Sequence, residues 1–152
     1  MDTFKKILKG KVVFVGIGNV LRGDDAFGPA LIEKLKAETD LTCIDAGSAP
    51  ENYTGKIIKE DPDTVVIADA AHLDLKPGEY AFLKKEEIAK TGLTTHDLSP
   101  NLFLEFLEKE TKAGIYMLAV QPENVSFGEE MSESIKNAIS EITDKIKETK
   151  NA

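Results

Sequence analysis

Apolar runs alternate along the chain with segments whose apolar residues recur at helical spacing. Four of the runs have the nearly continuous apolar character of strands that are buried on both faces of a sheet. They cover residues 11–17, 41–45, 64–70 and 115–120. A fifth, more polar run at residues 79–84 predicts a strand near an edge of the sheet.

Helical segments are predicted between these strands. Pro29 is suited to a first helical position and opens a helix over about residues 28–37. Further helices are predicted at residues 51–60, 101–112 and 132–147, with one short helical turn at 86–90. Strands that alternate with helices predict a three-layer α/β/α domain with a mainly parallel sheet.

Composition narrows the class of protein. A chain of 152 residues is long enough for one domain with a sizeable core, and we expect a single domain over residues 1–152. The net charge of -8 argues against a nucleic-acid partner, which would require lysine and arginine against its phosphates. The single cysteine, Cys43, excludes an internal disulfide framework, and its apolar surroundings predict a buried small side chain.

Targeting segments are not predicted either. No apolar run approaches the roughly 20 residues that a membrane-spanning helix needs. The first eleven residues are interrupted by lysines and lack the apolar core of a signal peptide. We therefore expect a cytoplasmic protein with no membrane partner.

Side chains that suit a metal site follow the predicted strands. Asp24 and Asp25 lie in the loop after the first strand, Asp69 lies at the end of the third, and His96 lies in a polar loop before a helix. Parallel strands should end at the same edge of the sheet, where open α/β folds bind ligands. Two carboxylates and an imidazole from separate loops could hold a divalent cation with open coordination positions.

Each of these residues also has a purely structural interpretation. The two acids of the first loop could cap a turn or a helix, and Asp69 could cap the loop that follows it. Asp97 could orient the ring of His96, as the partners of metal-bound histidines do. His72 competes with His96 because it lies nearer to Asp69 in the sequence, and composition alone does not choose between them.

Other chemistries are less well supported by the residues. Gly16 and Gly18 should let the chain turn sharply after the first strand, as in a dinucleotide-binding loop. Leu21 replaces the third glycine of that fingerprint, however, and the acids that follow would face a pyrophosphate. A serine nucleophile motif, Gly-x-Ser-x-Gly, is absent from the sequence. A carboxylate pair of Asp25 and Asp69 leaves acid-protease chemistry open.

Five short motifs follow one another at residues 16–28, 45–52, 66–79, 94–96 and 120–122. In order and spacing they resemble the motifs of nickel-iron hydrogenase maturation endopeptidases. The second motif is most similar to the form in the branch that processes the large subunit of hydrogenase 3, the formate-hydrogenlyase type. This resemblance implies a phosphorylase/hydrolase-like α/β/α domain whose mixed five-stranded sheet has one antiparallel strand, which suits residues 79–84.

The resemblance also implies an activity and a partner. Such peptidases remove a C-terminal extension from the precursor of the nickel-iron hydrogenase large subunit after nickel insertion, and nickel is thought to be carried by the precursor. Zinc or cadmium could occupy the same ligands. A relative without catalytic activity, acting as a metal-binding or chaperone module, is the alternative. We expect a monomer that docks transiently on its client.

The resemblance places roles on particular residues. The family's metal-contacting and catalytic residues fall on Asp25, Asp69 and His96, whereas the attacking group, a metal-polarised water or a water activated by an aspartate, stays open. The turn formed by Gly47, Ser48 and Ala49 is expected to be a substrate-docking loop, with a simple connection between strand and helix as the alternative. Of the two adjacent acids, Asp25 is expected to reach the metal and Asp24 to support the loop.

Overall fold

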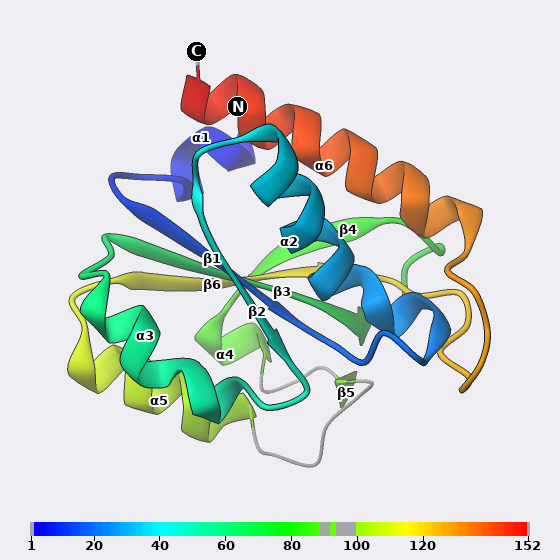
Figure 1. The fold of residues 1–152 in the computed structure, drawn as a ribbon, viewed down its shortest axis with the longest axis horizontal. Helices are drawn as coiled ribbons and strands as arrows, with labels where there is room; N and C mark the ends of the chain where they lie inside the picture. The colour runs from blue at the N-terminus through cyan, green and yellow to red at the C-terminus, as the bar shows by residue number, and fades with distance from the viewer. Residues whose placement is uncertain (1, 89–91, 94–99, 152) are drawn as a thin grey trace.

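A mixed sheet with the strand order β2-β1-β3-β6-β4 forms the centre of the molecule in this computed structural model (Figure 1), which describes residues 2–88, 92–93 and 100–151. Strands β2, β1, β3 and β6 are parallel, and β4 runs antiparallel along the edge beside β6. The strands are β1 (Val12–Ile17), β2 (Thr42–Gly47), β3 (Thr64–His72), β4 (Tyr80–Lys84), β5 (Gly92–Leu93) and β6 (Gly114–Val120). The short β5 pairs with the end of β3.

Helices cover both faces of the sheet (Figure 1). The longer ones are α2 (Phe27–Glu38), α5 (Pro100–Glu110) and α6 (Glu133–Asn151). The shorter ones are α1 (Thr3–Ile7), η1 (Gly23–Ala26), η2 (Pro50–Tyr53), α3 (Thr54–Lys59) and α4 (Lys85–Ile88). Helices α1, α2 and α6 lie on one face, and α3, α4 and α5 lie on the other.

The core is therefore divided into two halves by the sheet. Successive side chains of a strand point to opposite faces, so Phe14 and Val66 pack under α2 and α6 while Val15 and Val65 pack against the other helices. Both sets are buried, which is why the central strands read as unbroken apolar runs. The predicted three-layer arrangement and the antiparallel strand at the sheet edge are confirmed.

The boundaries differ from the predicted ones in several places. Helix α1 and strand β5 were not predicted, because five and two residues are too few for a hydrophobic period to be recognised. The predicted helix at 51–60 begins as the 3-10 turn η2, and β3 continues two residues beyond Ala70. Across the described residues, no helix is long and apolar enough to cross a membrane.

Cys43 lies on the outer strand β2 and is half-buried, so the prediction of a buried side chain was wrong. An outer strand has a neighbour on one side and leaves its side chains more accessible than a central strand does. Burial still raises the pKa of the Cys43 thiol to about 11. A thiol with this pKa is protonated at neutral pH, which agrees with a packing role rather than a nucleophilic one.

Candidate active site

The carboxyl-terminal ends of the parallel strands β1, β2, β3 and β6 lie side by side. We call this end of the sheet the carboxyl edge. In the register of β1 and β3, Gly16 lies opposite Ala68. Asp69 is therefore level with Ile17, the last residue of β1, and the loop that carries the first two acids begins at this level. The turn η1 lies against β3, so the topology brings the segments that bear Asp25 and Asp69 to the same edge, as predicted.

Glycines allow helix α2 to begin almost in contact with the sheet. A Cβ atom on Gly28 would lie 2.3 Å from the carbonyl oxygen of Ile17 and 2.5 Å from that of Ala68. A Cβ atom on Gly16 would lie 2.5 Å from the carbonyl oxygen of Gly28. Gly16 belongs to β1 itself, so its predicted role in a sharp turn was wrong, and it serves close packing instead. At Gly18 (φ 154°) a Cβ would meet the carbonyl oxygen of Asp25.

Asp24 joins the first loop to the loop that follows β6. Its side chain is fully buried and accepts hydrogen bonds from the backbone N–H groups of Glu123 (2.8 Å), Asn124 (3.0 Å) and Ser132 (2.6 Å). The hydroxyl of Ser132 donates a fourth bond at 2.7 Å. The backbone N–H of Asp24 donates in turn to the carbonyl of Asn124 at 2.8 Å. The prediction that Asp24 supports the loop is confirmed, through partners about a hundred residues away.

Asp25 lies next to Asp24 in η1 but is held differently. Its carboxylate is fully buried, and its Oδ2 accepts a hydrogen bond of 2.8 Å from the backbone N–H of Asn19. The side chain of Asn19 accepts a bond from the backbone of Leu21, so Asn19 shapes the loop around the carboxylate. The segment that carries Asp25 is thereby fixed at the start of α2, close to where β1 ends.

Asp69 is a fully buried acid within β3 rather than at its end. It points to the same face of the sheet as Val65 and Ile67, the face covered by α3 and α5. Its Oδ1 accepts a 2.8 Å hydrogen bond from the N–H of Ala70. A buried carboxylate costs folding free energy, so a fully buried one in the middle of an apolar strand is a candidate functional group.

Of the two histidines of the sequence, the structure describes only His72. His72 is exposed at the end of β3 and pairs with Gly92 through the backbone. His96 lies outside the described residues, and so do Thr94 and Thr95. Within the part of the chain that is described, no three histidine, cysteine or acidic side chains form a group that could hold a metal.

The segments that flank His96 are described, and both reach the carboxyl edge. Strand β5 pairs with Ala71 and His72 at the end of β3. Helix α5 leads into β6, whose first residue, Gly114, pairs with Thr64 at the opposite edge of the sheet. Helix α5 therefore begins toward the carboxyl edge, as Figure 1 shows.

The loop after β2 also lies at this edge. The carbonyl of Gly47 accepts a 2.9 Å hydrogen bond from the N–H of Gly18, which ties the loop to the first motif. Ser48 is exposed, and Gly47 and Ala49 are half-buried. Asp45, at the position of a ribose-binding acid in dinucleotide-binding folds, accepts a 3.0 Å bond from the N–H of Gly47 and so supports the turn.

Three further residues contribute to the edge without having been singled out. Asn19 positions Asp25, Ser132 positions Asp24, and Gln121 accepts a 2.6 Å hydrogen bond from the N–H of Leu73 after β3. The sequence signal for Asn19 and Gln121 was their presence in the motif segments at 16–28 and 120–122 that resemble those of the family. Ser132 had only the weaker signal of standing just before a helix.

Comparison with known proteins gives a consistent answer. The family model described as hydrogenase maturation protease matches residues 29–149. The hydrogenase 3 maturation protease of Escherichia coli is 36% identical over 130 residues, covering 84% of this chain and 83% of the relative. A putative hydrogenase maturation protease of Methanocaldococcus jannaschii is 31% identical, covering 90% of each chain.

Solved structures agree with these sequence relatives. The crystal structure of a NiFe hydrogenase maturation protease from Thermococcus kodakarensis has a TM-score of 0.90 at 31% identity, covering 99% of this chain and 100% of that one. The crystal structure of a hydrogenase 3 maturation protease has a TM-score of 0.82 at 30% identity, covering 95% and 92%. With its motifs, fold and matched length in agreement, this chain belongs to the hydrogenase maturation protease family.

Proposed function

We propose that this chain removes the C-terminal extension from the precursor of a nickel-iron hydrogenase large subunit after nickel has been inserted. The observation that carries the proposal is a pair of fully buried carboxylates, Asp25 and Asp69, on segments that meet at the carboxyl edge of a chain of this family. The hydrogenase 3 branch is supported by the name of the E. coli relative.

The donor set suits nickel that arrives with the substrate. Carboxylate and imidazole ligands hold a borderline divalent cation without competing with thiolates for it. Asp25, Asp69 and His96 would contact nickel held by the precursor, and zinc or cadmium could take the same ligands. Asp24 is not included because four donors already surround its carboxylate.

The inclusion of His96 rests on the resemblance of residues 94–96 to a motif of the family. The last described residue before it, Leu93, pairs with Ala71, two residues beyond Asp69. Gly47, Ser48 and Ala49 would line the path of the substrate from the other side of β1. Asp25 and Asp69 would then orient the scissile peptide beside the nickel.

The attacking water could be polarised by the nickel or activated by one of the carboxylates. In either case the protein acts as a monomer that docks transiently on its client. A cytoplasmic location agrees with the single cysteine, since a reducing compartment suits a free thiol.

The test is incubation with a nickel-loaded precursor, followed by mass spectrometry of its C-terminus. We expect the wild-type protein to release the extension, and Asp25→Ala, Asp69→Ala and His96→Ala to reduce the rate by about 100-fold or more. Glu60→Ala, at the opposite edge, serves as the control and should cleave normally. Unchanged cleavage by the three site variants would refute the site. A wild-type protein that binds the precursor and leaves its C-terminus intact would favour the chaperone alternative.

A further inference from the structure

Exposed apolar side chains gather around the carboxyl edge. Six large hydrophobic residues are exposed among those that the structure describes: Val20, Leu21, Leu75, Leu102, Phe106 and Phe127. Val20 and Leu21 follow β1, Leu75 follows β3 and Phe127 follows β6. Leu102 lies in the first turn of α5, which begins toward this edge. Contiguous exposed apolar groups mark binding surfaces, whereas scattered ones need no explanation.

Three of these side chains lie on two loops that are hydrogen-bonded to each other. The carbonyl of Leu21 accepts a 2.8 Å bond from the N–H of Gly128, the residue after Phe127. The side-chain Nε of Arg22 donates to the carbonyl of Val125 at 3.1 Å. Figure 1 shows the two loops beside each other, ahead of α2 and of α6. We call Val20, Leu21 and Phe127 the edge patch; their exposed fractions are 65%, 59% and 69%.

The edge patch is held in place by buried contacts. Asp24, in the first loop (after β1), accepts hydrogen bonds from Glu123, Asn124 and Ser132 in the second loop (after β6). A Cβ atom on Gly23 would lie 2.4 Å from the carbonyl oxygen of Asn124, so the loops approach each other closely below the patch. Apolar side chains on a preorganised loop pair can bind a partner at a low cost in conformational entropy.

The charge around the edge patch is negative. Glu123, Glu129 and Glu130 are all exposed on the second loop. Arg22, the one cation between Gly18 and Ala26, already has its Nε bonded to the other loop. An apolar surface with an acidic rim is complementary to a segment that combines apolar and basic side chains.

We propose that the edge patch binds an apolar segment of the precursor that has a basic residue beside it, separate from the residues that hold the nickel. The first loop carries Asp25 as well as Val20 and Leu21, so a segment seated on these two side chains is held at a set distance from the candidate active site. The edge patch thus selects the client and aligns its extension. This inference rests on the proposed function.

The test compares a patch variant with a matched control. Val20→Ser, Leu21→Ser and Phe127→Ser are combined in one variant, and Phe106→Ser removes an exposed aromatic ring (47%) further along α5. With nickel-loaded precursor, we expect the triple variant to raise KM by about tenfold or more with kcat nearly unchanged, since interface anchors act on binding. Phe106→Ser should keep the wild-type KM. Thermal unfolding checks that both variants are folded.

A charge variant tests the chemistry of the partner. Glu129→Lys together with Glu130→Lys should weaken binding of the precursor, and rising salt should weaken binding to the wild-type protein more than to this variant. Equal KM values for the triple variant and the wild type would overturn the proposal. So would a wild-type protein that dimerises through the edge patch in sedimentation experiments while the triple variant is monomeric.

Direct binding separates this inference from the proposed function. If the wild-type protein binds the precursor but does not cleave it, the proposed function fails, and the patch is still tested by whether the triple variant loses binding. If the wild-type protein cleaves and the triple variant cleaves with the same KM, the proposed function stands and the edge patch is rejected.

Discussion

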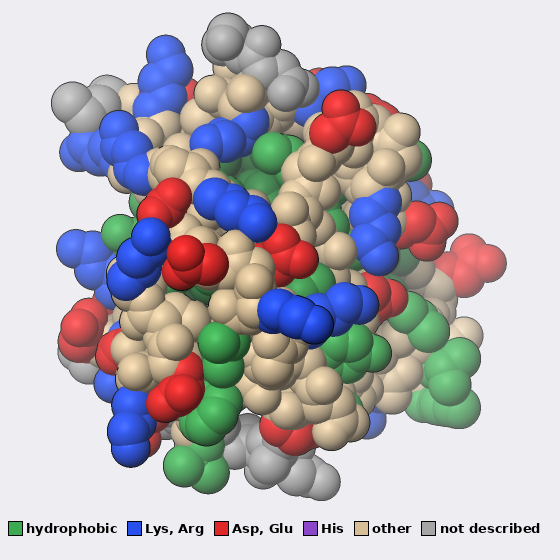
Figure 2. Space-filling view, turned by 60° about the vertical axis from the view of Figure 1, so that its left-hand side comes forward, with side chains coloured by type: hydrophobic (Ala, Val, Ile, Leu, Met, Phe, Trp, Pro, Cys, Tyr) green, Lys and Arg blue, Asp and Glu red, His purple; other side chains and the backbone are tan. Residues whose placement is uncertain are grey.

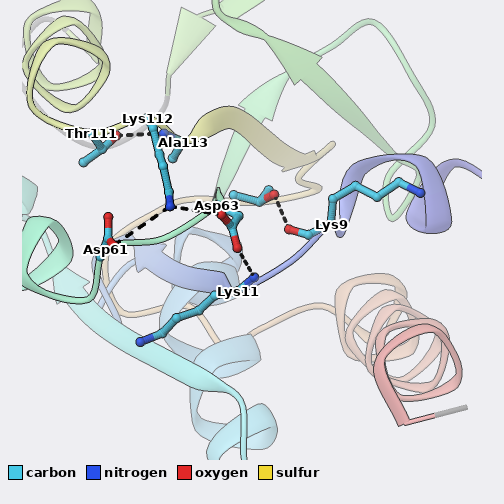
Figure 3. Close-up of polar contacts among 8 residues, drawn as sticks. Lys9, Lys11, Asp61, Asp63, Thr111, Lys112 and Ala113 are labelled. Carbon is cyan, nitrogen blue, oxygen red and sulfur yellow. Dashed lines mark hydrogen bonds and ion pairs between the residues drawn. The ribbon is translucent and has the colours of Figure 1, made fainter.

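The aspartates at the two ends of the parallel strands lie in opposite environments. We call the end of the sheet where β1, β2, β3 and β6 begin the amino edge, opposite the carboxyl edge. At the amino edge Asp61 and Asp63 are exposed and lie near Lys112, with oxygen to Nζ distances of 3.9 and 3.6 Å, and Asp63 accepts a 2.8 Å bond from the N–H of Lys11 (Figure 3). At the carboxyl edge Asp24 and Asp25 are fully buried. Figure 2 shows acidic and basic side chains mixed over the side that includes the amino edge.

The two environments have different consequences for stability and for function. Exposed acids near lysines are well solvated and contribute little to folding, because water screens them. Buried acids must be surrounded by donors or they destabilise the fold. Asp24 has four such donors, and the amino edge has no comparably buried acid among the described residues. Burying the acids of the carboxyl edge therefore costs folding free energy, whereas the exposed acids of the amino edge have no such cost. A local cost of this kind is typical of a functional site.

The largest effect on stability is expected for Asp24→Ala. This change leaves three backbone N–H groups and one hydroxyl without their acceptor inside the protein. We expect a loss of about 3–5 kcal/mol in the free energy of unfolding, measured by urea denaturation. Asp40→Ala, an exposed acid just before β2 at the amino edge, is the matched control and should change stability by less than about 0.5 kcal/mol. Similar losses at both positions would contradict the comparison.

A backbone change at the carboxyl edge should have the next largest effect. Gly28→Ala places a Cβ against the carbonyl oxygens of Ile17 and Ala68 and should cost about 3 kcal/mol, because two backbone segments must separate. Gly55→Ala in α3 has open space around its Cβ and should stabilise by about 0.5–1 kcal/mol. Thermal unfolding measures both changes. Gly28→Ala should lower the melting temperature and Gly55→Ala should raise it, and a shift in the same direction for both would contradict the prediction.

A smaller loss is expected for Ser132→Ala. Asp24 would keep its three backbone donors and lose the hydroxyl, so we expect a destabilisation of about 1 kcal/mol in urea denaturation. Ser134→Ala removes an exposed hydroxyl that binds Glu123 at 3.1 Å, and it should have almost no effect. An equal response of the two serines would show that the Asp24 network is not specially stabilising.

The smallest effect is expected at the amino edge and depends on pH. The backbone N–H of Lys11 bonded to Asp63, aided by nearby Lys112, holds the pKa of this carboxyl below its usual value of 3.8. A carboxyl whose pKa is lowered by folding stabilises the protein above about pH 4, and this contribution is lost as the pH falls through the lowered pKa. In thermal unfolding at pH 7, Asp63→Asn should therefore melt at a slightly lower temperature than the wild-type protein. This difference in melting temperature should vanish toward pH 2. A difference in melting temperature that grows as the pH falls would contradict this prediction.

Residue patterns alone predicted much of the architecture. Four apolar runs and the helices between them identified the parallel strands, and the more polar run at 79–84 identified the edge strand β4. The same order placed Asp25 and Asp69 after or within neighbouring strands, hence at one edge. These features are local or follow from the handedness and burial rules of α/β folds, so a single chain is enough to read them.

The role of each acid depends on contacts that form only in the folded chain. Asp24 and Asp25 are adjacent in the sequence, and the partners that make Asp24 a structural residue lie at 123–132, far beyond any local pattern. The edge patch likewise forms because two distant loops share hydrogen bonds. Gly16 and Gly28 are explained by a helix that begins in contact with two strands. Sequence periodicity indicates on which face of a strand or helix a residue lies. Contacts between loops that are distant in the sequence depend on the folded arrangement of the whole chain.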